Sequence, residues 1–396
     1  MSDHGFKLLK DELLSREQKT VIELPLDGSY VIVGGPGSGK TSLAIARAEQ
    51  ASQEQSNVLV LMFNRPLMLY VQAAQPKPDY EAWLKAVMEA GDFFAVPSPT
   101  GYTVSTYHSW LSSFYRSRFG YSYPEIDRFE PDWNEVEERL CSLGKVYNQV
   151  IIDEGQDFPL PLLRSLRSLA VNITVFIDPM QAMERTRTTV KEAASILGRG
   201  SYTYHLSTNY RCTKAIADFS NLFRHSGEIR ANLSRPGRKP AIIICGNYDE
   251  QLSVMSEIIR KCKGKTVGVI ADARSSYRLQ EELEEEMGDE VSVQRYQTLT
   301  YTEFDFDSPG VKIVTYGTMK GLEFDIVLLP RFTRVSTTGD YVADMNRLHV
   351  ATSRAKEQLF VFCFNEGAGN PDKWIDTLRP IRDREGYYVV SRVTNR

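Results

Sequence analysis

Short apolar runs rich in valine and isoleucine recur along the chain, and segments with helical spacing of apolar residues lie between many of them. Runs of this length predict buried strands, and their alternation with helices predicts parallel sheets in an α/β protein. The predicted strands are residues 30–33, 58–63, 149–152, 173–177, 241–245, 266–270, 311–315 and 326–329. The predicted helices are residues 41–50, 162–169, 213–223, 250–261 and 274–287.

The domain organisation follows from the number of strands and the length of the chain. The chain has 396 residues, whereas a single core rarely grows beyond about 250–300 residues. We therefore expect two α/β domains in tandem, residues 1–204 and 205–396, with the break inside residues 198–204. Residues 71–102 and 112–148 have a less regular pattern, and we expect them to be small insertions in the first domain.

Composition limits the class of protein. The net charge of −4 does not support a wholly basic polyanion binder, although it is compatible with a narrow basic groove. The five cysteines have no C-x-x-C spacing and the five histidines are dispersed, so we expect reduced cysteines and no zinc site. The N-terminus is polar and the apolar runs are only strand-length, so we expect a cytoplasmic protein without a membrane span.

A glycine-rich segment between the first predicted strand and the first predicted helix matches the pattern G-x-x-x-x-G-K-[ST]. Its glycines let backbone N–H groups turn towards phosphate oxygens, the lysine adds a positive charge, and the threonine hydroxyl can hold Mg²⁺. The sequence therefore predicts a P-loop that binds ATP with Mg²⁺. The predicted ATP-binding residues of this segment are Gly34, Gly35, Pro36, Gly37, Ser38, Gly39, Lys40, Thr41 and Ser42.

Two adjacent acids follow the predicted strand at residues 149–152. Ligands of open parallel sheets bind at the carboxyl ends of the strands, which is where these acids are expected to lie. Asp153 is predicted to complete the Mg²⁺ site with Thr41, and Glu154 to orient and polarise the attacking water. A strand that ends in a polar turn would give the same pattern, so the prediction depends on the P-loop upstream.

More polar residues lie close to predicted strand ends. Asp178 and Gln181 follow the strand at residues 173–177, and Arg354 follows residues 348–351, which the apolar pattern predicts to be a strand end. Arg211, in the segment at residues 209–211, follows Leu206. A nucleoside triphosphatase whose second domain supplies arginines to the γ-phosphate needs such residues. A single arginine at the end of an element is also compatible with a surface position or a salt bridge.

The order and spacing of these segments resemble the UvrD/Rep family of superfamily 1 helicases, from about residue 11 to residue 362. The matched segments are residues 14–18, 34–41, 58–71, 106–109, 153–157, 178–181, 209–211, 315–324 and 349–356. The resemblance implies two RecA-like P-loop domains with parallel sheets and ATP bound between them.

The resemblance also implies roles for individual residues. Gln18 would contact the edge of the adenine, Tyr210 would stack on its face, and Glu323 would contact the ribose. The residues that would reach the γ-phosphate and act in catalysis with Lys40 and Glu154 are Gln181, Arg211 and Arg354. The residues that match the single-strand track are Phe63, Asn64, Tyr107 and His108, and plain core packing stays an alternative for Phe63 and Tyr107.

Two departures from the family bear on function. Residues 182–187 contain no aromatic residue, although the family usually has base-stacking aromatics there. The insertion in the second core, between residues 290 and 311, is also short. We expect an ATP-dependent helicase or translocase that acts on single-stranded DNA. The alternative is an ATPase subunit that senses nucleic acid and regulates a partner, such as a nuclease in a bacterial defence complex, without processive unwinding. A P-loop small-molecule kinase is a further, less favoured reading.

Overall fold

The computed structural model describes residues 14–55, 57–63, 65, 68, 71, 85, 101–127, 130–179, 188–198, 202–223, 230–231, 235–296, 304–305, 308–332, 341–364 and 385–392. It confirms the predicted α/β class, because two parallel sheets carry the fold. The chain forms two compact units. The first comprises the described residues up to Gly35 and from Gly39 to Leu206, and the second comprises Pro36–Ser38 and the described residues from Ser207 onward.

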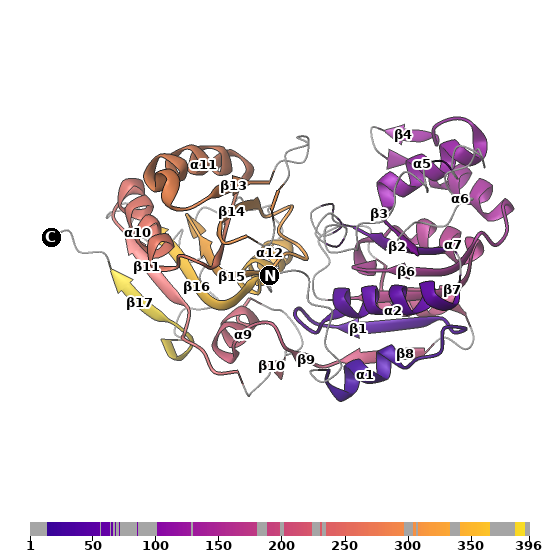
Figure 1. The fold of residues 1–396 in the computed structure, drawn as a ribbon, viewed down its shortest axis with the longest axis horizontal. Coiled ribbons are helices and arrows are strands. Elements are labelled where there is room, and N and C mark those ends of the chain that lie inside the picture. Colours follow the sequence, from indigo (N-terminus) through magenta and orange to yellow (C-terminus); the bar gives the residue numbers. More distant parts are fainter. Residues whose placement is uncertain are drawn as a thin grey trace. The chain divides into compact units, whose positions relative to one another are not determined.

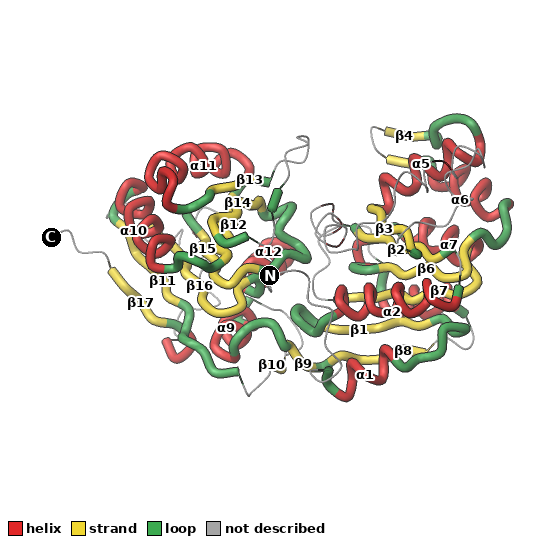
Figure 2. The backbone as a smooth tube through the Cα atoms, in the orientation of Figure 1, coloured by secondary structure: helices red, strands yellow, loops and turns green. Residues whose placement is uncertain are grey.

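The first unit contains a six-stranded sheet with the strand order β3-β2-β6-β7-β1-β8, and all its strand pairs are parallel. Figures 1 and 2 show this sheet with its helices. The strands are β1 (Tyr30–Gly34), β2 (Val58–Met62), β3 (Tyr102–Thr106), β6 (Tyr147–Ile152), β7 (Ala170–Ile177) and β8 (Tyr202–Leu206). The helices are α1 (Arg16–Ile22), α2 (Lys40–Glu54), α5 (Tyr107–Phe119), α6 (Trp133–Ser142), α7 (Leu160–Leu169) and α8 (Val190–Leu197).

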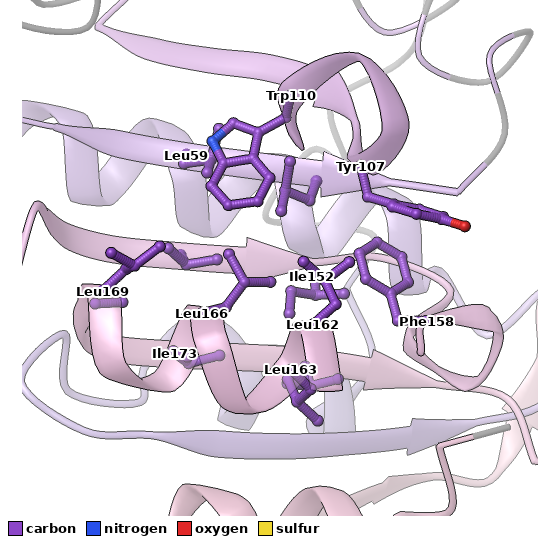
Figure 3. Packing of buried hydrophobic residues seen from close by; sticks show 14 of the residues in the cluster. Leu59, Tyr107, Trp110, Ile152, Phe158, Leu162, Leu163, Leu166, Leu169 and Ile173 are labelled. Carbon is purple, nitrogen blue, oxygen red and sulfur yellow. The ribbon is translucent and has the colours of Figure 1, made fainter. Parts of the chain in front are cut away.

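Alternation of side chains along the strands builds a core on each face of this sheet. On β2, Leu59 and Leu61 join the cluster that contains α5, α6, α7 and α8, whereas Val60 joins the cluster that contains α1 and α2. Figure 3 shows the first cluster, in which Trp110 of α5 and Leu166 of α7 pack beside the strands. The sheet is therefore covered on both faces, which explains why its inner strands are continuous apolar runs.

The segment at residues 112–148, which we predicted to be a small insertion, forms helices over about half of its length. It contains most of α5, the whole of α6 and the antiparallel pair β4 (Glu125–Asp127) and β5 (Glu130–Pro131). Trp110, Phe114 and Tyr115 of α5 are buried at helical spacing. The expected insertion at residues 71–102 lies mostly outside the described residues.

The second unit contains a seven-stranded sheet with the order β13-β14-β12-β15-β16-β11-β17, also parallel throughout. Its strands are β11 (Ala241–Cys245), β12 (Thr266–Ala271), β13 (Val293–Arg295), β14 (Gly310–Thr315), β15 (Phe324–Leu329), β16 (Ala355–Phe364) and β17 (Val389–Arg392). Its helices are α9 (Lys214–Asn221), α10 (Tyr248–Lys261), α11 (Ala273–Met287) and α12 (Tyr341–Thr352). The short elements are β9 (Thr208–Asn209), β10 (Arg230–Ala231), η3 (Gly288–Glu290) and η5 (Glu385–Tyr387).

One predicted strand end in this unit is wrong. Residues 348–351 belong to α12, because the buried residues Met345, Leu348 and Thr352 recur at helical spacing. Among the described residues, no helix combines the length and the apolar character needed to cross a membrane.

Candidate nucleotide-binding site

The P-loop connects the inner strand β1 to α2 in the first unit. Gly37 and Gly39 have φ angles of 70° and 88°, which glycine adopts without the steric cost that other residues pay. Gly39 is the N-cap of α2 and has no side chain with which to cap it. The first N–H groups of α2 and the positive end of its dipole therefore form a site that favours an anion.

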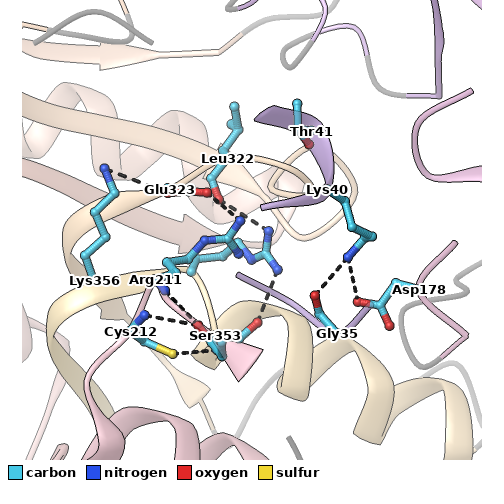
Figure 4. A network of polar contacts seen from close by, with 12 residues as sticks. Gly35, Lys40, Thr41, Asp178, Arg211, Cys212, Leu322, Glu323, Ser353 and Lys356 are labelled. Atoms are coloured by element: carbon cyan, nitrogen blue, oxygen red, sulfur yellow. Dashed lines mark hydrogen bonds and ion pairs between the residues drawn. The ribbon is translucent and has the colours of Figure 1, made fainter. Parts of the chain in front are cut away.

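Lys40, the first residue of α2, is 7% exposed. Its Nζ donates to the carbonyl oxygens of Gly34 and Gly35, each at 2.9 Å, and lies 3.3 Å from Oδ2 of Asp178 (Figure 4). Asp178 is fully buried and follows β7, the neighbour of β1 in the sheet. The buried ammonium thus has three acceptors within the first unit.

Thr41 and Asp153, the two residues predicted to hold Mg²⁺, are in direct contact. The Thr41 hydroxyl donates to Oδ2 of Asp153 at 2.7 Å. Asp153 follows β6, so β6, β7 and β1 deliver their polar residues to the same edge of the sheet. Burial and the neighbouring Glu154 raise the pKa of Asp153 to about 6, although Thr41 and Lys40 oppose this shift.

Burial and Glu154 disfavour the charged form of Asp153, and a divalent cation bound to its carboxylate would offset that cost. In the part of the chain that the structure describes, no three His, Cys, Asp or Glu residues gather into a metal-binding group. Mg²⁺ is usually held by one or two protein groups together with substrate phosphates and water. Thr41 and Asp153 are the residues that would hold it.

Glu154 has a left-handed backbone, with φ 56° and ψ 41°, and is 6% exposed. Gln156, which the sequence analysis did not single out, donates from Nε2 to Oε2 of Glu154 at 2.5 Å. The Oε1 of Gln156 accepts the backbone N–H of Asp178 at 2.8 Å. Gln156 therefore joins Glu154 to the strand end that carries the partner of Lys40.

The second unit carries the predicted arginines. Arg211 forms an ion pair with Glu323, and Lys356 Nζ lies 3.9 Å from Glu323 Oε2 (Figure 4). Burial raises the pKa of Glu323, but Arg211 and Lys356 outweigh it and hold that pKa below its ordinary value. The Nε and Nη1 atoms of Arg211 are buried without a hydrogen-bond acceptor among the described residues. These donors suit an added anion.

Arg354 is 1% exposed and its guanidinium binds its own unit. Nε donates to the carbonyl oxygen of Val350 at 3.0 Å, Nη1 to that of Leu322 at 3.4 Å, and Nη2 to the hydroxyl of Ser353 at 3.2 Å. In this conformation the side chain is used to hold the turn after α12. A contact with phosphate would require it to exchange some of these acceptors.

The two residues predicted to contact adenine, Gln18 and Tyr210, make hydrogen bonds within the fold. Gln18 is 2% exposed, and its Oε1 accepts the Ser15 N–H at 3.0 Å in the capping box that begins α1. Helix capping thus accounts for part of the pattern at residues 14–18. Tyr210 is half-buried, and its N–H donates to the carbonyl oxygen of Gly37, which groups with the same unit, at 2.8 Å. Gln181 and Asn64 lie outside the described residues.

The structure brings three of the predicted track residues together at the ends of β2 and β3. The Phe63 ring lies 5.8 Å from the Tyr107 ring and 6.4 Å from His108, and Tyr107 and His108 are 3.6 Å apart. His108 is exposed, Phe63 is half-buried and Tyr107 is 7% exposed. Although the side chain of His108 is exposed to solvent, the atoms packed around its ring partly desolvate it, and this lowers the pKa of His108 and favours the neutral ring. We call Phe63, Tyr107 and His108 the aromatic surface.

Fold and geometry together define an α/β protein with a P-loop at an inner strand of its first parallel sheet. No protein-family model matches the chain. No curated protein matches it either. Among solved structures, the C-terminal domain of a possible DNA helicase from Lactobacillus plantarum WCFS1 is similar at 19% sequence identity and a TM-score of 0.33, over 46% of this chain and 98% of that chain.

Proposed function

We propose that the protein is an ATPase that couples hydrolysis of ATP to movement on, or remodelling of, single-stranded DNA, in the manner of UvrD-like helicases. The observation that carries the ATPase part is the 2.7 Å hydrogen bond from Thr41 to Asp153. It joins the hydroxyl of a P-loop to the carboxylate at the end of another strand of the sheet, the pair that nucleoside triphosphatases use for Mg²⁺.

Each residue of the site has a distinct task in this proposal. Lys40 leaves its carbonyl acceptors to bind the phosphates, while Thr41 and Asp153 hold Mg²⁺. The bound Mg²⁺ would neutralise charge on the β- and γ-phosphates. Glu154, held by Gln156, orients the attacking water and accepts its proton. Arg211, with two donors that lack acceptors among the described residues, is suited to the γ-phosphate, and we assign the same task to Arg354 and Gln181.

The nucleic-acid part of the proposal rests on the order of the motifs and on the aromatic surface. A neutral histidine beside two other rings offers stacking faces rather than a point charge. Stacking of bases on such rings contributes about 1–3 kcal/mol per base and tolerates any sequence. Phe63 and His108 are the more accessible members, so they are the proposed contacts with the bases. Tyr107 is mostly buried and packs against both of them.

One observation favours the alternative of a nucleic-acid-sensing ATPase that regulates a partner. Strands β13 and β14 pair directly and only residues 296–309 join them. The UvrD-like helicases that the sequence resembles carry a large insertion at this point, which serves engagement of the duplex. A chain without this insertion can hydrolyse ATP when bound to single-stranded DNA and still fail to unwind a duplex.

Steady-state ATP turnover with single-stranded DNA, duplex DNA or RNA tests the proposal. We expect stimulation by single-stranded DNA, loss of turnover in Lys40→Ala, and a fall of about 10²–10⁴-fold in kcat for Glu154→Gln. Glu138→Gln, an exposed change of the same chemistry, is the matched control. Turnover that ignores all three nucleic acids would refute the coupling. Stimulated turnover without strand displacement would favour the regulatory alternative.

A further inference from the structure

The proposed function leaves open how single-stranded DNA bound to the aromatic surface would accelerate hydrolysis at Glu154. Both features belong to the first unit, and the segment between them is short. Glu154 is followed by the 3₁₀ turn η2 (Gly155–Asp157), and η2 is followed by Phe158. The chain passes from the proposed base to an aromatic side chain within four residues.

Phe158 contacts the aromatic surface from the inside. Its ring lies 5.2 Å from the Tyr107 ring. Figure 3 shows the two rings side by side. Phe158 is fully buried and Tyr107 is nearly so, whereas His108, 3.6 Å from Tyr107, is exposed. A base stacked on His108 or Phe63 would press on Tyr107, and Tyr107 in turn rests on Phe158. Because Phe158 is fully buried, it cannot itself contact the bound DNA.

The turn is packed so that it cannot absorb such a displacement locally. A Cβ atom on Gly155 would lie 2.5 Å from Cγ1 of Val175, which means that the turn lies directly against β7. Asp157 N–H donates to the carbonyl oxygen of Glu154 at 3.0 Å, and Phe158 N–H donates to that of Gly155 at 3.2 Å. Because closely packed elements shift as units, a movement of Phe158 would rotate the turn rather than compress it.

The other end of the turn holds the reacting carboxylate. Gln156 is 1% exposed and bridges Oε2 of Glu154, at 2.5 Å, to the backbone N–H of Asp178, at 2.8 Å. The left-handed backbone of Glu154 is a sparsely populated conformation for a residue other than glycine. A rotation of the turn would therefore change where the Glu154 carboxylate points relative to the P-loop.

We propose that the turn Gly155–Asp157 transmits occupancy of the aromatic surface to the Glu154 carboxylate, with Phe158 as the contact towards the strand and Gln156 as the contact towards the carboxylate. This inference rests on the proposed function, and it assigns positioning roles to two residues that touch neither strand nor nucleotide. The physical element is one rigid turn between two sites, whose equilibrium position both sites bias.

The test is Phe158→Leu, which keeps an apolar side chain in the core and removes the ring that faces Tyr107. We expect basal ATP turnover to stay within about twofold, affinity for single-stranded oligo-dT to stay within about threefold, and stimulation by oligo-dT to fall about tenfold, inside the range of measured couplings. Phe114→Leu is the matched control, because Phe114 is a fully buried ring of the same core that packs on Trp110 and Tyr147.

The outcomes separate this inference from the proposed function. A wild-type protein that no nucleic acid stimulates refutes the proposed function itself. Stimulation of the wild type that survives in Phe158→Leu refutes the inference alone. A parallel loss of oligo-dT affinity also refutes it, because Phe158 would then shape the grip rather than transmit it. Equal losses in Phe158→Leu and Phe114→Leu would show general damage to the core and refute the specific route.

Gln156→Met provides a second measurement that does not depend on the aromatic core. Methionine has the length of glutamine but makes neither hydrogen bond. We expect the ratio of stimulated to basal kcat to fall about tenfold while KM for ATP changes less than about threefold. A variant that lowers basal and stimulated kcat by the same factor would show that Gln156 serves catalysis only, and would overturn its part in transmission.

Discussion

Replacing Arg47 with methionine should lower the unfolding free energy of the first unit by about 3 kcal/mol. Arg47 lies on α2 and is fully buried. Its Nη1 donates to the carbonyl oxygens of Val21 and Leu24, at 3.0 and 2.9 Å, and its Nη2 donates to that of Pro25 at 3.3 Å. The guanidinium thus binds the chain that leaves the C-terminus of α1, where helix carbonyls lack partners within the helix.

The magnitude follows from two opposing contributions. Two buried carbonyls, those of Val21 and Leu24, would lose a charged donor, and each buried acceptor left without a partner costs about 1–3 kcal/mol. Against this, methionine removes the cost of burying a charge, a cost also expressed in the lowered pKa of Arg47, which desolvation causes. The Nε atom of Arg47, which is buried without an acceptor among the described residues, adds to that cost. About 3 kcal/mol remains after the offset.

Urea unfolding followed by tryptophan fluorescence measures the effect, since Trp110 is buried in the first unit. Arg139→Met is the control, because Arg139 is about two-fifths exposed and pairs with the equally exposed Glu135, a type of ion pair that contributes less than about 1 kcal/mol. If Arg47→Met and Arg139→Met unfold within about 1 kcal/mol of each other, the reasoning about buried carbonyl acceptors is wrong.

Three further outcomes are expected. Thr41→Val should lower Mg²⁺-dependent kcat by about a hundredfold, whereas Thr41→Ser should retain most of the activity, as measured by ATP turnover across a Mg²⁺ titration. Equal activity of the two variants would contradict the assignment of Thr41 to the Mg²⁺ site. Glu323→Gln should lower Tm at pH 7, because pairing with Arg211 depresses the pKa of Glu323 and stabilises the fold only while the carboxylate is charged. The Tm difference between wild type and variant should therefore vanish as pH falls below 4.5. A Tm difference that grows in acid would contradict this reasoning. Gly155→Ala should cost about 1–3 kcal/mol in a denaturant titration because the added methyl group would meet Val175, and an unchanged midpoint would contradict the close packing.

The inner strands of the first sheet, and β11, β12, β14 and β15 of the second, could be predicted from sequence because they are largely buried. The inner strand β16 was missed because it begins with the mostly polar residues 355–358, and the apolar pattern placed a strand end at residues 348–351, inside α12. Strands β1, β2, β6 and β7 are apolar over most of their length, so no alternation obscures them. The edge strands β8 and β17 were missed for the opposite reason. Tyr202 of β8 and Val390 of β17 are more than half exposed, and such strands have no apolar signature. Burial, more than β propensity, decided which strands the sequence revealed.

The site shows a similar limit. The contact between Thr41 and Asp153 was predictable because the chemistry proposed for the P-loop and the acidic pair fixes residue types and spacing. Arg47 and Gln156 were not, because their partners are backbone groups far away in sequence: Arg47 binds carbonyls 22–26 positions upstream, and Gln156 accepts an N–H 22 positions downstream. A backbone partner leaves no trace in residue type, so only the fold could reveal these contacts.

Lys40 in the first unit and Arg211 in the second each have acceptors within their own unit, although Arg211 Nε and Nη1 lack one among the described residues. Lys40 has Gly34, Gly35 and Asp178 as acceptors, and Arg211 has Glu323. Under the proposed function, a nucleotide phosphate would compete with acceptors that are already in place, and it would gain only the difference between the two sets of contacts. Asp178 is fully buried, so turning Lys40 away from it leaves a carboxylate that its remaining partners must support. Gln156 accepts the backbone N–H of Asp178 and donates to the carboxylate of Glu154. Asp178, the acceptor that Lys40 would give up, is therefore linked to the proposed base through one side chain. Under the proposed function, binding of phosphate and positioning of Glu154 are then coupled through this hydrogen-bond chain, and strand occupancy would enter the same chain through the turn after Glu154.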